Sequence, residues 1–219
     1  MIKGYALIFF ALSLISGVSK SSTVIEDFVL KATPMEFDQK LKTQYALESG
    51  ALVATVRKSS SALVLPFDQI KLITNVSYDW CTTRDMTKVN REKEQKKEGD
   101  DAALRLGLLL SGTPPGVPLF VPNWIKRLEK LVKFPTQGVL FITSGVSADA
   151  GKSWVSPYTQ YISMTVAQST PKNLSWCKHG QAGKFQAKIP IESTGLWFMA
   201  DGDDTRASFT TWISNIQIQ

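Results

Sequence analysis

The chain has 219 residues, of which 43% are hydrophobic and 10% aromatic, and this is enough apolar material for one core of ordinary domain size. Its formal net charge is +6, a modest basic excess that permits contact with anionic glycans or a membrane surface. We expect no nucleic-acid partner. Two cysteines and one histidine are too few ligands for a structural zinc site, so that class of metal-dependent domain is excluded.

Residues 1–22, MIKGYALIFFALSLISGVSKSS, follow the order of regions in a secretory signal peptide. Lys3 precedes an apolar run over about residues 5–15, and small residues follow. The run is too short to span a bilayer comfortably, and an uncleaved N-terminal membrane anchor is the alternative. We therefore expect a periplasmic or secreted protein in which residues 23–219 form a single domain.

The two cysteines, Cys81 in YDWC and Cys177 in LSWC, each follow a tryptophan, which suggests partly buried strand ends. Two cysteines in an exported chain can pair in an oxidising compartment. The sequence does not fix the distance between their Cα atoms, on which a disulfide depends. A disulfide and a pair of buried free thiols are therefore both open.

From residue 23 onward the apolar pattern is mostly that of short strands. YALESGALVATV alternates on both sides of a turn at residues 48–50, which predicts a hairpin. IKLITNVSYDWC, residues 70–81, predicts a further strand rich in β-branched and aromatic residues. The next stretch, residues 82–101, is highly charged and almost without apolar residues, so we interpret it as a solvated loop or a frayed helix.

AALRLGLLL, residues 102–110, predicts a strand with Leu104, Leu106 and Leu108 on one face and Arg105 and Gly107 on the other. The proline-rich segment that follows cannot form a regular element.

An amphipathic helix is predicted over about residues 123–133, where Asn123 caps WIKRLEKLVKF. Its apolar stripe is typical of a helix packed on a core. Its basic face leaves contact with an anionic membrane surface as the alternative.

The rest of the chain adds five more strand patterns. They occupy residues 138–145, 160–169, 183–191, 194–200 and 208–219. Many short strands separated by turns and by a single helix predict an all-β antiparallel sandwich.

The trio Gly-Asp-Asp occurs twice, at residues 99–101 and 202–204, each time before a predicted strand and shortly before an arginine. In EGDDAALRLGLLL, SPYTQYISMTVAQS and GLWFMADGDDTRASFTTWISNIQI, taken in this order, the chain resembles a family of bacterial secreted proteins known only as a domain of unknown function. The resemblance covers roughly residues 24–219. It implies a jelly-roll sandwich of the carbohydrate-binding-module kind, but likeness of fold is not evidence of sugar binding.

The two acidic turns are the first candidate site. Their carboxylates belong to Asp100, Asp101, Asp201, Asp203 and Asp204. They resemble the oxygen-rich loops that calcium prefers, although the spacing is not that of an EF-hand. The alternative is structural, because Asp and Gly favour turns and because Arg105 and Arg206 could each pair with the opposite turn. That arrangement requires the strands near residues 101–110 and 205–218 to lie close together.

Aromatic side chains are the second candidate site, since proteins commonly grip the faces of sugars with them. Trp154, Tyr158 and Tyr161 lie in or beside a loop-like region and are the predicted ligand-binding residues. Trp197 and Trp212 lie within strands, so we expect them in the core.

The sequence carries no signature of an activated nucleophile, so we do not expect an enzyme. The leading hypothesis is an exported, non-catalytic β-sandwich that binds a glycan or a cell-envelope polysaccharide, with no cofactor other than possible calcium at the acidic turns. One alternative is an envelope structural or interaction protein that uses the basic helix. The other is a carboxylate-dependent hydrolase, which needs two acids at a defined separation.

Overall fold

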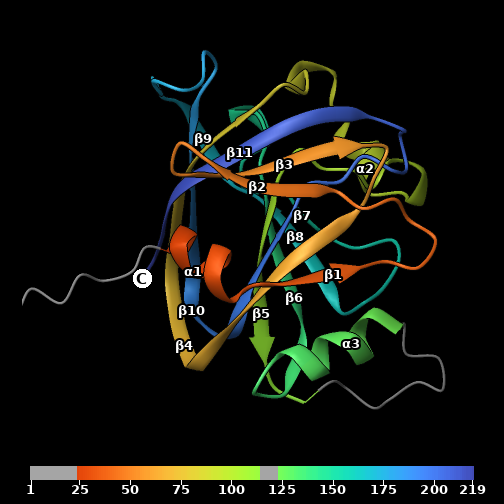
Figure 1. Ribbon diagram of the computed structural model, residues 1–219, viewed down its shortest axis with the longest axis vertical. Coiled ribbons are helices and arrows are strands. Elements are labelled where there is room, and N and C mark those ends of the chain that lie inside the picture. The colour runs from red at the N-terminus through yellow and green to blue at the C-terminus, as the bar shows by residue number, and fades with distance from the viewer. Residues whose placement is uncertain (1–23, 114–122) are drawn as a thin grey trace, which may run out of the picture.

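The computed structural model describes residues 24–113 and 123–219 (Figure 1). The expected secretory segment, residues 1–22, and most of the proline-rich segment lie outside the described residues. Strands predominate in the described part, and the predicted all-β, sandwich-like class is confirmed. In residues 24–113 and 123–219 we find no helix of the length and hydropathy that a membrane span requires.

Eleven strands form one sheet, in which nine follow the order β2-β3-β11-β4-β10-β5-β6-β8-β7, while β1 pairs with β4 and β9 with β10. Their bounds are β1 Thr33–Glu36, β2 Gln44–Glu48, β3 Ala51–Arg57, β4 Ser61–Thr82, β5 Arg105–Ser111, β6 Thr136–Thr143, β7 Ser153–Val155, β8 Ile162–Val166, β9 Gln168–Pro171, β10 Gln181–Met199 and β11 Ser208–Ile218. The sheet is mixed, where a purely antiparallel one was expected, because β6 and β8 are parallel. β7 comes between them in the chain but lies outside β8 in the sheet, so the chain reverses twice before β8 pairs with β6.

Two long strands, β4 and β10, fold the sheet into a sandwich-like shape. β4 folds back at its lower end in Figure 1, where residues 68–72 are all exposed. The pairing of β10 with β4 shifts register between Gln186 and Ile191 and again between Ser193 and Gly195. Irregular pairing of this kind bends a strand. The sequence predicted separate shorter strands here because the polar residues 68–69 and 192–193 interrupt the apolar runs and resemble turns.

The larger core is lined by alternate residues of β3, β4, β5, β10 and β11. Leu104, Leu106 and Leu108 lie in it, as their spacing predicts, together with Leu196 and Phe198 of β10. The helix α1 (Val24–Lys31) adds Phe28 to this core.

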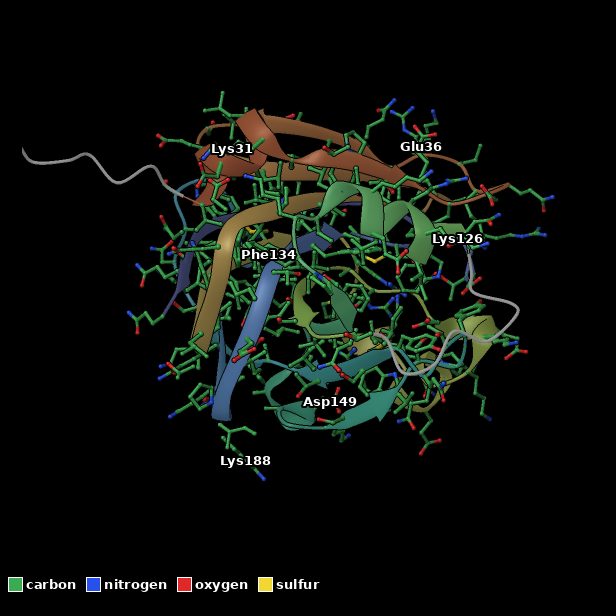
Figure 2. All side chains as sticks on the ribbon, turned by 90° about the horizontal axis from the view of Figure 1, so that it is seen from below. Lys31, Glu36, Lys126, Phe134, Asp149 and Lys188 are labelled. Atoms are coloured by element: carbon green, nitrogen blue, oxygen red, sulfur yellow. A yellow bond between two sulfur atoms is a disulfide. The ribbon has the colours of Figure 1, made fainter. Side chains whose placement is uncertain are left out.

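A second apolar cluster lies on the opposite face of the sheet, under α3 (Asn123–Leu131). Trp197 and Met199 belong to this cluster because they alternate along β10 with the residues of the larger core. The helix buries Leu128 in the cluster and leaves Lys126 exposed (Figure 2). It ends two residues before the predicted boundary.

The hairpin predicted at residues 48–50 is confirmed, since β2 and β3 pair with Glu48 opposite Ala51. Ser49 and Gly50 both have left-handed backbones, with φ of 51° and 78°. Two consecutive residues of this kind match the right-handed twist of the strands that they join.

The charged stretch before β5 is more ordered than predicted. It contains η1 (Met86–Lys88), α2 (Arg91–Glu94) and η2 (Lys97–Gly99), and a further short turn, η3 (Ser147–Asp149), packs nearby. Arg91 and Glu94 are buried and pair with each other, and the Arg91 Nε lies 3.2 Å from the Asp149 carboxylate. The interpretation as a solvated loop is wrong for these two residues, because their mutual pairing permits burial. The described part also has more helices than the single one predicted.

A candidate ligand-binding pocket between two acidic turns

The two Gly-Asp-Asp turns lie against each other. The backbone N–H of Asp201 donates to the Ala102 carbonyl at 2.9 Å. The completely buried Asp101 carboxylate accepts from the backbone N–H groups of Asp204 at 3.0 Å and Thr205 at 2.8 Å, and from the Thr205 hydroxyl. Asp101 therefore fastens the second turn to the first through charge-assisted hydrogen bonds.

The strands that follow the turns are not neighbours. β4 and β10 separate β5 from β11 in the sheet, so the turns meet while the strands do not. The expectation that the two acidic corners lie close together therefore holds at their loops but not along their strands.

Arg105, at the start of β5, links the two turns from the buried side. Its guanidinium donates to the Asp100 carboxylate, and its Nη1 lies 3.9 Å from the Asp201 carboxylate. Both neighbouring acids are buried, as is Arg105 itself. The predicted pairing of Arg105 with the second turn is therefore present, as the 3.9 Å contact between Arg105 and Asp201.

Arg206 departs from the prediction. It is exposed, its backbone is left-handed with φ of 55°, and it forms no ion pair with any described residue. The turn exposes Arg206 at the surface, so the pairing expected with the first turn is not made.

A cavity of about 210 Å³ opens beside the joined turns. Its polar side consists of Lys40, Ser60, Arg105, Ser156, Tyr158, Thr159 and all of the turn carboxylates except that of Asp101. Its apolar side consists of Phe37, Trp124, Phe141, Ile162, Met164, Trp197 and Met199. The cavity thus lies where the second apolar cluster meets the acidic turns.

The aromatic wall is arranged around Trp197 of β10. Phe37 stacks on it with ring centres 6.2 Å apart and an angle of 20° between the planes. Trp124 of α3 and Phe141 of β6 meet it edge-on, with ring centres at 5.9 and 5.7 Å. Gly107 permits this packing, because a Cβ there would lie 2.9 Å from atoms of Phe141 and Trp197. The wall is therefore preformed by packing within the chain.

The polar side reaches the surface through Tyr158 and Lys40. The Tyr158 hydroxyl lies 2.7 Å from the Asp204 carboxylate and 2.9 Å from the Lys97 carbonyl, and 51% of the residue is exposed. Burial, and then the Asp204 carboxylate, raise the pKa of Tyr158. Lys40 pairs with Asp203 and lies 3.6 Å from the Asp204 carboxylate.

Asp201 has the most perturbed carboxyl group of the pocket. Burial raises its pKa to about 8, against the opposing attraction of Arg105, and the neighbouring carboxylates raise it further. Near neutral pH its carboxyl group is therefore largely protonated and can donate a hydrogen bond.

Two buried donors at the cavity lack a hydrogen-bond partner within the described residues. They are Nε1 of Trp197 and Nε of Arg105, and both residues line the cavity. A buried donor without an acceptor costs about 1–3 kcal/mol. Such donors suit a ligand that brings oxygen acceptors.

The predicted aromatic platform is not assembled. Tyr158 lines the cavity, but Trp154 of β7 packs against the second apolar cluster instead. Tyr161 is half-buried, and its carbonyl accepts from the Val139 N–H at 2.9 Å. The wall comes instead from strand faces opposite the larger core, from α3 and from the segment after β1. Trp197 is both buried, as predicted, and part of the wall. The alternation of Trp197 with Leu196 and Phe198 was the signal for this placement.

Calcium at the acidic turns is not favoured by their geometry. Asp101, Asp201 and Asp203 have oxygens within 4.8 Å of one another. The Asp101 carboxylate, however, already accepts three hydrogen bonds, and Asp203 pairs with Lys40. Calcium needs six to eight oxygen ligands, whereas these oxygens are held in a hydrogen-bonded turn. We therefore propose no metal here.

The basic face of α3 is partly used within the chain. Arg127 donates to the Asp38 carboxylate at 2.6 Å and to the Glu36 carbonyl at 2.7 Å. Lys133, just beyond the helix, pairs with Asp68 at 2.6 Å. The membrane-contact alternative therefore rests on Lys126 and Lys130, which are exposed.

A disulfide joins Cys81, near the end of β4, to Cys177, in the loop between β9 and β10. Their Cα atoms lie 6.3 Å apart, within the usual range for such a bond. Of the two alternatives left open by the sequence, the structure has the disulfide.

The model of a family described as protein of unknown function (DUF3047) matches residues 32–217. The chain belongs to this family. The DUF3047 match runs from just before β1 almost to the end of β11, so it includes both acidic turns, the cavity and the disulfide. None of the curated proteins matches the chain. The resemblance to a family of unknown function is thereby confirmed, while secretion and the likeness to carbohydrate-binding modules stay expectations.

Proposed function

We propose that this DUF3047 protein is a non-catalytic binding protein for a small polyhydroxylated ligand, such as the terminal ring of a glycan, held between the joined acidic turns and the aromatic wall. One observation carries the proposal: a single cavity combines an aromatic wall with carboxylate acceptors and with buried donors that lack partners. A hydroxyl group both donates and accepts, so it can satisfy both kinds of polar group.

The size of the cavity narrows the ligand class. Its volume, about 210 Å³, is below the roughly 300–1,000 Å³ of pockets that enclose drug-sized molecules. One sugar ring with its apolar face against Trp124 or Phe37 fits this scale. A longer glycan would continue outward past the exposed rim at Tyr158.

We infer that binding takes place outside the cytoplasm, in the periplasm or after secretion. The signal-like residues 1–22 support this inference. The disulfide agrees with it, because disulfides persist mainly in oxidising compartments. In that location the protein would encounter the glycans of the cell envelope, so we propose one of these as its ligand.

Isothermal titration of the purified protein with a panel of neutral mono- and disaccharides tests the proposal. We expect at least one sugar to bind, and Trp124→Ala and Tyr158→Ala each to weaken it by about tenfold or more. Trp154→Phe, outside the cavity, is the matched control and should leave affinity unchanged. Absence of binding to every sugar, or equal losses in all three variants, would contradict the proposal.

Carboxylate-dependent hydrolysis is the second candidate, favoured by one observation. Asp201, with a pKa of about 8, has the character of a general acid beside other carboxylates. To distinguish binding from hydrolysis, the affinity for a disaccharide and its cleavage are measured for the native protein and for Asp201→Asn. A binding protein would keep its affinity and show no turnover in either form, whereas a hydrolase would cleave the sugar only in the native form.

A further inference from the structure

A second, larger hollow of about 760 Å³ surrounds the disulfide and shares no lining residue with the first cavity. We refer to it as the disulfide groove. Three tryptophans line it: Trp80 of β4, Trp212 of β11 and Trp176 in the loop at residues 172–180. Trp80 is buried, and the other two are half-buried, so each tryptophan is recessed.

The loop at residues 172–180 is fixed at several points, which makes the disulfide groove a built feature. Cys177 is tied to β4 by the disulfide, and the backbone N–H of Lys172 donates to the Gly180 carbonyl at 2.9 Å. The Lys172 ammonium lies 2.7 Å from both carboxylate oxygens of the buried Asp79. These ties hold Trp176 on the same hollow as Trp80.

The charge of the disulfide groove is unbalanced. Arg84, Lys178 and His179 line it, and none of them forms an ion pair with a described residue. The one carboxylate among its described lining residues is Asp85, which already pairs with Lys88 at 3.1 Å and caps η1. Arg84 and Lys178 leave the lining positively charged, which suits an anionic occupant.

The polar atoms in the walls of the disulfide groove also lack partners. Nε1 of Trp80, Nη1 of Arg84 and Oγ of Ser169 are buried and have no hydrogen-bond partner among the described residues. All three residues line the groove. Each can donate a hydrogen bond, and each is costly to leave unpaired.

We propose that the disulfide groove binds an acidic carbohydrate, a segment of a sugar chain whose rings carry carboxylates. The half-buried Trp176 and Trp212 receive sugar rings, Arg84 and Lys178 pair with the carboxylates, and the buried donors face ring and hydroxyl oxygens. The volume, more than three times that of the first cavity, allows more than one ring. The proposal does not depend on the function of the first cavity.

The recessed tryptophans decide between an acidic glycan and a membrane. Aromatic residues that anchor a protein to a lipid surface lie on its exposed outer face, where they can enter the headgroup region. Here Trp80 is only 2% exposed, and Trp176 lies within a hollow. A chain of rings can enter such a hollow, whereas a bilayer surface cannot.

Calorimetric titration with a galacturonate hexasaccharide tests the proposal, with its fully methyl-esterified form as the neutral comparison. We expect the acidic form to bind at least about tenfold more tightly, and its affinity to fall as salt is added. Equal affinity for the two forms, or absence of binding to both, would overturn the assignment.

Variants then locate the binding site. Trp176→Ala and Lys178→Gln, both in the surface loop, should each weaken hexasaccharide binding severalfold, and Arg84→Gln by about tenfold or more. Lys126→Gln is the matched charge control, because Lys126 is exposed on α3 and does not line the groove. Tyr158→Ala reports on the first cavity, and both of these variants should bind the hexasaccharide as the native protein does. If Lys126→Gln weakens binding as much as Lys178→Gln, attraction to the net charge explains the result and the groove assignment fails.

Three other anionic probes test the choice of ligand class under the same conditions. They are a glutamate hexapeptide, a short DNA duplex and vesicles that contain phosphatidylglycerol. We expect each to bind more weakly than the hexasaccharide and to be insensitive to Trp176→Ala. Tighter binding of any of the three, lost in Trp176→Ala, would overturn the carbohydrate assignment.

Discussion

At the scale of single residues, the joined turns depend on one buried carboxylate. Asp101→Ala removes the acceptor of two backbone N–H groups and one hydroxyl, so we expect a loss of roughly 2–4 kcal/mol in the free energy of unfolding. Urea denaturation measures it. Asp101→Asn keeps one acceptor oxygen and should lose less, and the exposed Glu92→Ala should change little. A loss in Asp101→Ala no larger than in Glu92→Ala would show that the hydrogen bonds do not hold the turns.

Because its pKa is raised, Asp201 makes the free energy of unfolding fall as the pH rises. Its folded pKa, about 8, lies above its unfolded value of 3.8, so the folded state holds the proton more tightly. This contribution to stability is complete below about pH 4 and is lost as the pH rises through about 8. Asp201→Asn resembles the protonated side chain and removes this loss.

The Asp201 prediction is tested by urea denaturation of native and Asp201→Asn protein at about pH 5 and about pH 9. Relative to the native protein, the variant should gain stability between the two values, because only the native carboxyl group must ionise. Asp149→Asn is the control, because the pKa of Asp149 is lowered from 3.8 and its carboxyl group is ionised in both the folded and the unfolded protein at both pH values, so its stability relative to the native protein should not change between them. Parallel pH profiles for native and Asp201→Asn protein would contradict the burial of a protonated acid.

At the scale of elements, the disulfide fastens the loop at residues 172–180 to β4 across 96 positions of sequence. A link across so long a segment restricts the unfolded chain strongly, and removal of such a disulfide typically costs about 2–5 kcal/mol. Cys81→Ser combined with Cys177→Ser should lower the free energy of unfolding by that amount in urea. The native protein with a reductant should unfold at the same midpoint as the double variant. An unchanged midpoint in both would show that the loop is held without the bond.

Removal of the same disulfide should affect only one of the two proposed binding sites. Cys177 lines the disulfide groove, whereas neither cysteine lines the first cavity. At temperatures where it is still folded, the double serine variant should therefore bind a neutral sugar in the first cavity as the native protein does. Its affinity for the acidic hexasaccharide should fall.

At the scale of the whole molecule, the long strands make one cooperative unit. β4 and β10 contribute side chains to both apolar clusters, and one sheet contains every described strand. We therefore expect residues 23–219 to unfold in a single transition. Tryptophan fluorescence and far-ultraviolet circular dichroism should give the same urea midpoint. Two separate midpoints would divide the chain into independent parts.

Much of the fold could be predicted from local pattern. The Ser49–Gly50 turn and the alternation through Leu104, Leu106 and Leu108 depend on residues close in sequence, and both predictions are confirmed. The bends of β4 and β10 were missed because the polar residues 68–69 and 192–193 resemble turns between separate strands. The burial of Arg91 was missed because, besides the nearby Glu94, it depends on Asp149 and on the Ser144 carbonyl, which lie 58 and 53 residues away.

The candidate sites divide in the same way. The sequence alone determined the β-rich class, the amphipathic helix that begins at Asn123 and the presence of two acidic turns, since these follow from periodicity and turn chemistry within short windows. Only the tertiary structure decided that Trp197 would join Tyr158 at one cavity, and that Trp176 would join Arg84 around a disulfide. Which of these residues meet depends on the order of the strands in the sheet and on which face of the sheet each side chain occupies. Both are decided only when all the strands pack together, because no short segment contains that information.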